Sequence, residues 1–209
     1  MARRATVTPE QILNSAAREF ADRGFAGARV DRIAKRARVN KAMLYYHFAG
    51  KDGLYRALLR GIFTDGVARL QAIVASDGSA ADRLDRVIAG IQSFIDEHPW
   101  FPAIMMREVT EGGTHLDRDT VNAMAGLPRT IGALVEEGCR TGEFEPVHPL
   151  YAYFSMMAPL AFFHVSTPLR RQIAARHFPG TPADDRPAFT THMQNMVRRM
   201  LVRPRPAKR

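Results

Sequence analysis

Residues Val39–Lys51 read VNKAMLYYHFAGK, and this stretch is the most informative part of the chain about its fold. Its obligate core residues are expected to be Val39, Leu44 and Phe48. Asn40 is a preferred helix N-cap, so the stretch predicts a short helix that ends at Phe48. The remaining side chains are polar or aromatic, and they are available to contact a partner.

Two further helices are expected before this stretch. Thr8 can cap a helix that starts at Pro9, with Gln11 completing a capping box and Gly24 as the expected stop. The apolar spacing then predicts a short helix over residues 30–37. A brief turn separates this helix from the one in the opening stretch, and two short helices so joined form a helix-turn-helix.

Beyond residue 51 the apolar residues keep helical spacing, with no strand pattern and no internal repeat, so the predicted fold class is all-α. One long helix is expected from about Asp52 to a loop near Ser76. Pro128 and Pro159 are expected to kink or interrupt the helices that contain them. The other expected helices cover residues 81–97, 100–110, 117–141, 147–165 and 187–202, and residues 167–186 are expected to form a loop with a short helix at 170–177.

Charge is distributed unevenly along the 209 residues, whose net charge is +9. Residues 1–60 carry a balance of +8, residues 61–197 carry −5 and the last twelve residues carry +6. A basic N-terminal region on a mildly acidic body predicts a polyanionic partner for that region. A solvated surface is the alternative, but here the positive charge coincides with the helix-turn-helix.

Several classes of protein are disfavoured by the sequence. The sequence contains no run of about 18 apolar residues, so no membrane span is expected. The N-terminus lacks the apolar segment of a signal peptide, so export is not expected. The single cysteine, Cys139, excludes an intramolecular disulfide, is expected to be buried, and fits a cytoplasmic location. The seven histidines show no known zinc spacing, and no catalytic motif is present, so neither a metal, a cofactor nor an enzymatic activity is expected.

The most specific pattern in the N-terminal region is the run Leu-Tyr-Tyr-His-Phe followed by a lysine. It belongs to a longer series of matching positions: Ile12, Ala16, Ala17, Phe20, Gly24, Phe25, Val30, Ile33, Ala34, Ala37, Arg38, Val39, Asn40, Lys41, Leu44, Tyr45, Tyr46, His47, Phe48, Lys51 and Leu54. On these residues the chain resembles the TetR family of bacterial transcriptional regulators. The resemblance implies a DNA-binding domain over residues 1–55 and a helical ligand-binding and dimerisation domain over residues 56–203. The composition of residues 204–209 predicts a disordered basic tail.

The resemblance also implies that the helix after Asn40 lies in the major groove of DNA, with its first residues at the base edges. Lys41, Ala42 and Met43 are then the base-facing candidates. The other predicted DNA-binding residues mostly contact phosphates or support the helix: Thr8, Arg29, Arg32, Asn40, Tyr45, Tyr46, His47 and Lys51. Packing between helices is the alternative for one of the two tyrosines, and capping alone is the alternative for Thr8.

Some positions depart from the family pattern. Arg29 replaces a common Ser or Thr, Arg38 replaces a Gly in the turn, and Ala42-Met43 replaces a Gly-Thr or Gly-Ser pair. Met43 cannot donate a hydrogen bond, so any base contact there would be apolar, for instance with a thymine methyl group. These departures motivate the alternative function, a helical small-molecule binding protein with weak or no specific DNA recognition.

One helix-turn-helix covers few base pairs, so a homodimer on a palindromic operator is expected. By analogy with the family, the dimer surface is expected on the final helix and residues 147–165. A small apolar or amphipathic effector is expected in the larger domain, where a ligand would release a repressor from DNA. The predicted ligand-binding residues are Trp100, Phe101, Met105, Arg107, Met124, Phe154, Met157, Phe163 and His164. Core packing is the alternative for each of them.

Overall fold

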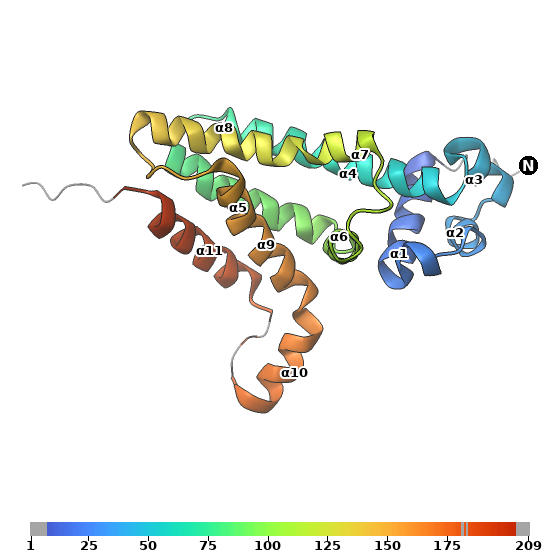
Figure 1. Cartoon of the computed structure of the whole chain (residues 1–209). Helices are drawn as coiled ribbons and strands as arrows, with labels where there is room; N and C mark the ends of the chain where they lie inside the picture. The colour runs from blue at the N-terminus through green and yellow to red at the C-terminus, as the bar shows by residue number, and fades with distance from the viewer. Residues whose placement is uncertain (1–7, 181, 183, 204–209) are drawn as a thin grey trace, which may run out of the picture. The chain divides into compact units, whose positions relative to one another are not determined.

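The computed structural model describes residues 8–180, 182 and 184–203. Within these ranges the chain forms helices joined by turns, as the apolar spacing predicts, so the all-α prediction is confirmed (Figure 1). The helices are α1 (Pro9–Gly27), α2 (Val30–Ala37), α3 (Lys41–Phe48), α4 (Lys51–Val74), α5 (Ala80–Glu97), α6 (Phe101–Thr110), α7 (Arg118–Met124), α8 (Gly126–Thr141), α9 (Pro149–Val165), α10 (Thr167–His177) and α11 (Arg186–Leu201).

The described residues cluster into two compact units. The first contains the described residues up to Thr64 together with Trp100–Met124, and the second contains Asp65–Pro99 and the described residues from Ala125 onward. The expected boundary between a DNA-binding domain (1–55) and a ligand-binding and dimerisation domain (56–203) stays a prediction. The predicted tail at 204–209 lies outside the described residues.

In the first unit, α1 packs against α2 and α6, and α2 packs against α3. Ile12 and Phe20 of α1, Ile33 of α2 and Leu44 of α3 are fully buried, so each helix of the N-terminal region contributes to one apolar core. Burial of such side chains is the main force that holds short helices together, because helices of eight residues are unstable alone.

The start of α4 lies very close to the end of α3. A Cβ atom placed on Gly53 would lie 1.7 Å from the carbonyl oxygen of Phe48, a distance that no side chain can tolerate. Gly53 therefore permits the close approach that fixes α3 against the following helix.

In the second unit, α5 packs against α8, α9 and α11, and α9 packs against α8, α10 and α11 (Figure 1). The core of this unit is apolar and includes Leu84, Ile88, Ile131, Met156, Leu160 and Val197. After α8 the chain turns so that Phe144 is buried against Gly138, and Phe144 forms an isolated antiparallel bridge with Val202.

Three predicted helix boundaries need correction. Gly24 interrupts the helical backbone of α1, as expected, with φ 67° and ψ 175°, but one further helical turn follows this kink and extends α1 to Gly27. The predicted helix over residues 117–141 is interrupted, as Pro128 indicated, but the break lies at Ala125. Pro128 therefore lies in the first turn of α8, where its missing N–H has no cost. α10 begins at Thr167, earlier than expected, because Pro168 favours a first helical turn.

Three predictions of burial were too strong. Val39 and Phe48 are half-buried, whereas Leu44 is 1% exposed. Cys139 is also half-buried, and its Sγ atom lies 3.4 Å from the carbonyl oxygen of Glu145. None of the helices within the described ranges combines the length and the hydropathy that a bilayer span requires.

Candidate nucleic-acid interface

The turn before α3 is built by local interactions. Arg38 ends α2 in the left-handed conformation, with φ 58° and ψ 38°, where a glycine would be less strained. The N–H of Val39 then donates to the carbonyl oxygen of Ala34 at 3.0 Å. Asn40 caps α3, because its Oδ1 accepts the Met43 N–H at 2.8 Å. The turn and the cap together fix the direction in which α3 leaves α2.

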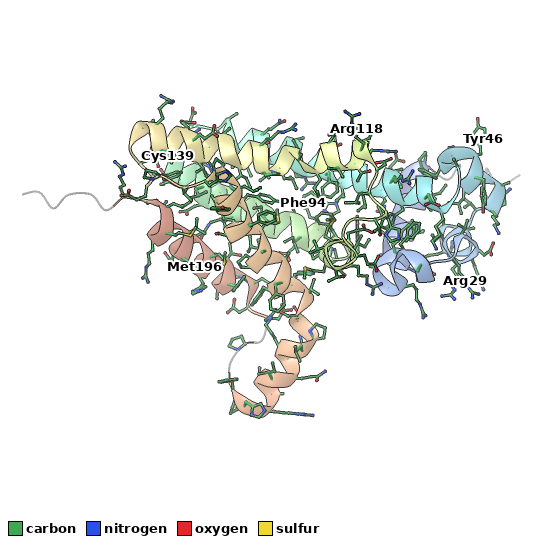
Figure 2. The ribbon with its side chains drawn as sticks, viewed as in Figure 1. Arg29, Tyr46, Phe94, Arg118, Cys139 and Met196 are labelled. Atoms are coloured by element: carbon green, nitrogen blue, oxygen red, sulfur yellow. The ribbon has the colours of Figure 1, made fainter. Side chains whose placement is uncertain are left out.

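The outward side of α3 carries most of the residues predicted to contact DNA. Tyr46 is 86% exposed and extends from α3 into solvent (Figure 2). Lys41, Ala42, Tyr45 and His47 are also exposed, and Met43 is half-buried. A phenol, an imidazole and an ammonium group on one short helix can donate hydrogen bonds to phosphate oxygens and base edges.

Each of the two α3 tyrosines has a neighbour. The ring of Tyr45 lies against Gly50, where an added Cβ would be 3.4 Å from the ring, so Tyr45 has a packing role as well as an exposed hydroxyl group. Tyr46 meets the ring of His47 edge-on at 5.1 Å and is otherwise in solvent. Of the two, Tyr46 is therefore the less constrained by packing.

Lys41 is paired within the protein. Its Nζ lies 3.0 Å from Oδ1 of Asp31 in α2, and this hydrogen bond raises the pKa of Lys41. Both side chains are exposed, so the pair is weak, and Lys41 remains positively charged at neutral pH. A phosphate or a guanine edge can replace Asp31 as the partner of Lys41 at little cost.

Arg29 and Arg32 occupy different environments although both were predicted to bind DNA. Arg32 lies 3.5 Å from the carboxylate of Glu19, whose side chain is buried. The backbone N–H of Arg29 donates to the same carboxylate at 3.4 Å, while the Arg29 side chain is exposed (Figure 2). Glu19 therefore joins α1 to the start of α2. Within the described ranges, the side chain of Arg32 has an ion-pair partner and that of Arg29 has none.

Lys51 and Thr8 lie at the starts of α4 and α1. The ammonium group of Lys51 donates to the carbonyl oxygen of Ala26 at 3.1 Å and lies 4.7 Å from the centroid of the Phe25 ring. Thr8 is exposed, and its N–H donates to the side-chain oxygen of Gln11 at 3.3 Å, as a capping box predicts. The predicted phosphate contact of Lys51 must therefore compete with contacts inside the protein.

Three exposed cations near α3 were not among the predicted site residues. Lys35 and Arg36 lie on the outer side of α2, and Arg38 lies in the turn before α3. Their outward positions follow from the helical spacing of Val30, Ile33 and Ala34, so the sequence carried the signal. Together with Arg29 and Lys41 they add exposed positive charge to α2, the turn and α3.

The predicted ligand-binding residues divide between the two units. Trp100, Phe101, Met105, Arg107 and Met124 lie in the first unit. Phe101 is buried and meets the ring of Phe63 edge-on at 5.6 Å, which is core packing. The guanidinium of Arg107 lies beside Gly24, where an added Cβ would be 2.7 Å from Nη1.

Phe154, Met157, Phe163 and His164 lie in the second unit. Phe163 stacks on Phe189 at 3.8 Å, whereas Phe154 is exposed. His164 has a buried Nδ1 atom without a hydrogen-bond partner, and burial lowers the pKa of His164.

Two open hollows lie on this unit, of about 470 and about 350 Å³, and none of the nine predicted ligand residues lines either one. The ligand site stays a prediction.

Comparisons with known proteins agree with this geometry. Residues 12–58, which include α2 and α3, match the model of bacterial regulatory proteins of the tetR family. Residues 81–200 match the tetracyclin repressor-like C-terminal domain. These two matches cover most of both units.

Similar proteins are regulators of transcription. The chain is 30% identical over 171 residues to the HTH-type transcriptional repressor NicS of Pseudomonas putida, covering 79% of each chain. It is 25% identical over 205 residues to the HTH-type transcriptional regulator RutR of Escherichia coli, covering 97% of this chain and 94% of RutR. The transcriptional regulator FadR of Bacillus subtilis, solved in complex with stearoyl-CoA, shares the fold with a TM-score of 0.74 at 17% identity, covering 91% of this chain and 97% of FadR.

A capped, basic, solvent-facing α3 held by a tight turn defines a helix-turn-helix DNA-binding protein. The chain belongs to the tetR family of bacterial regulatory proteins. It is a DNA-binding regulator of transcription, which confirms the family resemblance found in residues 8–60.

Proposed function

We propose that this protein is a homodimeric repressor that binds a palindromic operator and leaves it when a small molecule binds. The observation that carries the proposal is the outward side of α3, where Lys41, Tyr46 and His47 are exposed while Leu44 fixes the helix in the core. Such a helix can enter the major groove of DNA while Leu44 stays buried in the core of the domain. Because the chromosome is the target, we expect the protein to act in the bacterial cytoplasm.

The DNA-binding part is tested by selecting bound fragments from a random DNA pool. A repressor of this type should enrich one palindrome whose half-sites lie about 34–36 Å apart, or a multiple of that distance. Salt-sensitive binding with no enriched motif would contradict specific recognition. That outcome would favour the alternative, a helical small-molecule binding protein.

The dimer is supported by the outer side of α9. Residues 149–165 contain no Asp, Glu, Lys or Arg, and Tyr151, Phe154 and Phe162 are exposed on one side of the helix, opposite the buried Met156 and Leu160. A helix that is apolar on all sides needs partners on all sides. Met196 (Figure 2) and Met200 of α11 are exposed as well. Both helices predicted for the dimer surface therefore offer apolar side chains.

A second copy of the chain is the partner that a palindromic operator requires. Size-exclusion chromatography with light scattering should therefore give twice the mass of one chain at concentrations that bind the operator. A monomer under those conditions would overturn the two-half-site arrangement.

The effector is proposed to be a small apolar or amphipathic molecule that contacts His164. The buried Nδ1 of His164 has no hydrogen-bond partner, so a polar group of a ligand can satisfy it. FadR of Bacillus subtilis, a structural neighbour, was solved in complex with stearoyl-CoA, so a long-chain acyl-CoA and its free fatty acid are suitable first probes, followed by smaller apolar compounds.

An effector should release the protein from its selected operator in a titration followed by fluorescence anisotropy. His164→Leu should weaken the response to that effector and leave operator affinity without effector unchanged. His192→Leu is the matched control, because His192 is exposed on α11. An equal effector response in all three proteins would remove His164 from the proposed site.

A further inference from the structure

A buried carboxylate in the first unit has an incomplete set of partners. Glu108 of α6 is 2% exposed, and its Oε1 accepts hydrogen bonds from the hydroxyl group of Tyr55 at 2.6 Å and from Nδ1 of His115 at 3.0 Å. The other oxygen, Oε2, is buried and has no hydrogen-bond partner. A buried carboxylate that lacks full pairing is costly, and native proteins pair such groups or bind metal ions with them.

A second carboxylate reaches the same imidazole. Oε2 of Glu111 lies 3.4 Å from Nδ1 of His115. One ligand atom each from Glu108, Glu111 and His115 lies within 4.8 Å of the others. Among the described residues, no lysine or arginine forms an ion pair with either carboxylate. In the part of the chain that the structure describes, His115 is therefore the one basic side chain paired with the two carboxylates.

The local sequence explains why these three side chains meet. Glu108 and Glu111 are three residues apart, so they share one side of the last turn of α6. Gly112 and Gly113 then take φ values of 71° and 72°, and the Gly113 N–H donates to the carbonyl oxygen of Glu108 at 2.7 Å. This reversal, which glycine permits, brings His115 back over α6.

The imidazole is held in place by aromatic rings. The ring of His115 lies 4.2 Å from the ring of Phe25 and 6.1 Å from that of Tyr55, centroid to centroid. The end of α6 also adds the partial negative charge of a helix C-terminus to the site. The three donors are thus positioned before any ion arrives, in a negative environment.

We propose that Glu108, Glu111 and His115 form a binding site for one divalent transition-metal ion of the zinc class. Two carboxylates and an imidazole are ligands that zinc uses when further positions stay open to water or another ligand. Ligands about 2.0–2.1 Å from a tetrahedral zinc ion lie roughly 3.3 Å from each other. The observed separations of 3.0 and 3.4 Å from the His115 Nδ1 fit that arrangement, and all three ligand atoms lie within 4.8 Å of one another. The ion would take the place of the Nδ1 proton, which would leave for solvent or move to Nε2, so that the imidazole binds the ion in its neutral form.

Binding at this site would connect three elements of the first unit. The ion would join the end of α6 to the turn that contains His115, and Glu108 already accepts a hydrogen bond from Tyr55 of α4. Sequence spacing missed the site, because Glu-x-x-Glu-x-x-x-His is not a familiar zinc motif and Tyr55 lies 53 residues before Glu108. The site does not depend on the identity of the effector or of the operator.

The test is equilibrium dialysis of the untagged protein against micromolar zinc, followed by elemental analysis. Wild-type protein should retain one zinc ion per chain. Glu111→Gln should reduce the affinity about tenfold or more, because one ligand is lost. Glu111 is exposed, so this variant should keep its fold, which circular dichroism checks. Glu136→Gln, at an exposed carboxylate on α8, is the matched control and should bind like the wild type.

A second measurement identifies the ligands. Cobalt(II) added to the wild-type protein should give visible absorption without a thiolate charge-transfer band, because Cys139 is not a proposed ligand. His115→Gln should abolish that spectrum, and His177→Gln, at an exposed histidine on α10, should preserve it. Less than one zinc ion per chain, or an unchanged zinc affinity in a folded Glu111→Gln variant, would overturn the proposal. Neither measurement uses DNA, so failure of the metal site and failure of the regulatory function are distinguishable.

Discussion

Helices α3 and α9 both present aromatic side chains to solvent, but the groups around those rings differ. On α3, Tyr46 carries a hydroxyl group, and Lys41 on the same helix and Arg38 in the turn before it are exposed cations. On α9, Phe154 and Phe162 are exposed on a helix without a single charged residue. Exposed aromatic rings therefore do not by themselves show whether a helix binds DNA or another protein chain. The charged residues near the rings distinguish the two kinds of partner.

The supporting contacts of the two helices differ in the same way. α3 has one fully buried side chain, Leu44, and owes its position to a cap, a turn and the close approach of Gly53. α9 buries Ala152, Tyr153, Met156 and Leu160 and is part of the core of the second unit. A short helix that is fixed by its cap and turn keeps its outer side chains free to contact DNA. A long helix that is apolar on both its buried and its exposed side is typical of a subunit interface.

The largest expected effect comes from placing charges on α9. Phe154→Glu combined with Phe162→Glu should strongly weaken the dimer, because each of the four substituted residues, two in each subunit, can contribute about 1 kcal/mol to the interface. The dimer dissociation constant should then rise roughly 1,000-fold. Light scattering and operator titration measure both consequences.

The matched control for this double variant is Val109→Glu, which adds a charge at an apolar residue of α6 that is also exposed. It should leave the dimer intact. If the α9 variant also remained dimeric at low concentration, the interface would have to lie elsewhere.

The next effect concerns the support of α3. Gly53→Ala should lower the free energy of unfolding of the first unit by about 3 kcal/mol, because the added methyl group collides with the Phe48 carbonyl oxygen. Gly61→Ala lies in the same helix with open space around it, and it should raise stability by about 0.5–1 kcal/mol. Urea denaturation followed by circular dichroism compares the two; equal effects would show that the close approach is not required.

A smaller effect is expected at the base-facing end of α3. Lys41→Ala should reduce the preference for the selected operator over altered half-sites by about tenfold if Lys41 contacts a guanine. Lys35→Ala, on the outer side of α2, should weaken binding to all sequences alike and reduce its salt dependence. Titration of several operators at two salt concentrations separates these outcomes. Uniform weakening by Lys41→Ala would make Lys41 a phosphate contact.

The smallest effect is expected from the partner of Lys41. Asp31→Asn removes the acceptor that holds the Lys41 ammonium group in the free protein, together with a negative charge near DNA. Operator affinity should rise about two- to threefold, while thermal stability stays unchanged, because exposed ion pairs contribute little. A fall in affinity would mean that Asp31 positions Lys41 for binding rather than competing for it.

The sequence predicted the local structure of the N-terminal region closely. α2 and α3 have the expected bounds, and Asn40 caps α3 as its type and position indicate. The sequence placed Arg38 in the turn, where the family has a glycine, and the structure shows that Arg38 takes the left-handed conformation there. These features depend on residues a few positions apart, which is why sequence patterns reveal them.

The candidate site was only partly predictable for a different reason. Exposure of Lys41, Tyr46 and His47 follows from helical spacing once Leu44 is assigned to the core. The partners of Arg32 and Lys51 do not follow, because Glu19 and Ala26 belong to other elements that only folding brings near. The sequence also could not show that the predicted ligand residues lie in two different units. Apolar residues at helical spacing occur both in helices that form a core and in helices that line a pocket.

By itself, the sequence determined that this chain is helical, that its N-terminal region is a basic helix-turn-helix, and which family it belongs to. Caps, turns and helical periodicity are local properties, and a short specific motif carries the resemblance. Only the tertiary structure decided that Glu108 meets both Tyr55 and His115, and that α9 keeps an apolar side in solvent. Such contacts depend on how helices that are distant in the sequence pack against each other. The free energy of that packing comes from burying side chains, and helical spacing does not show which of those side chains meet.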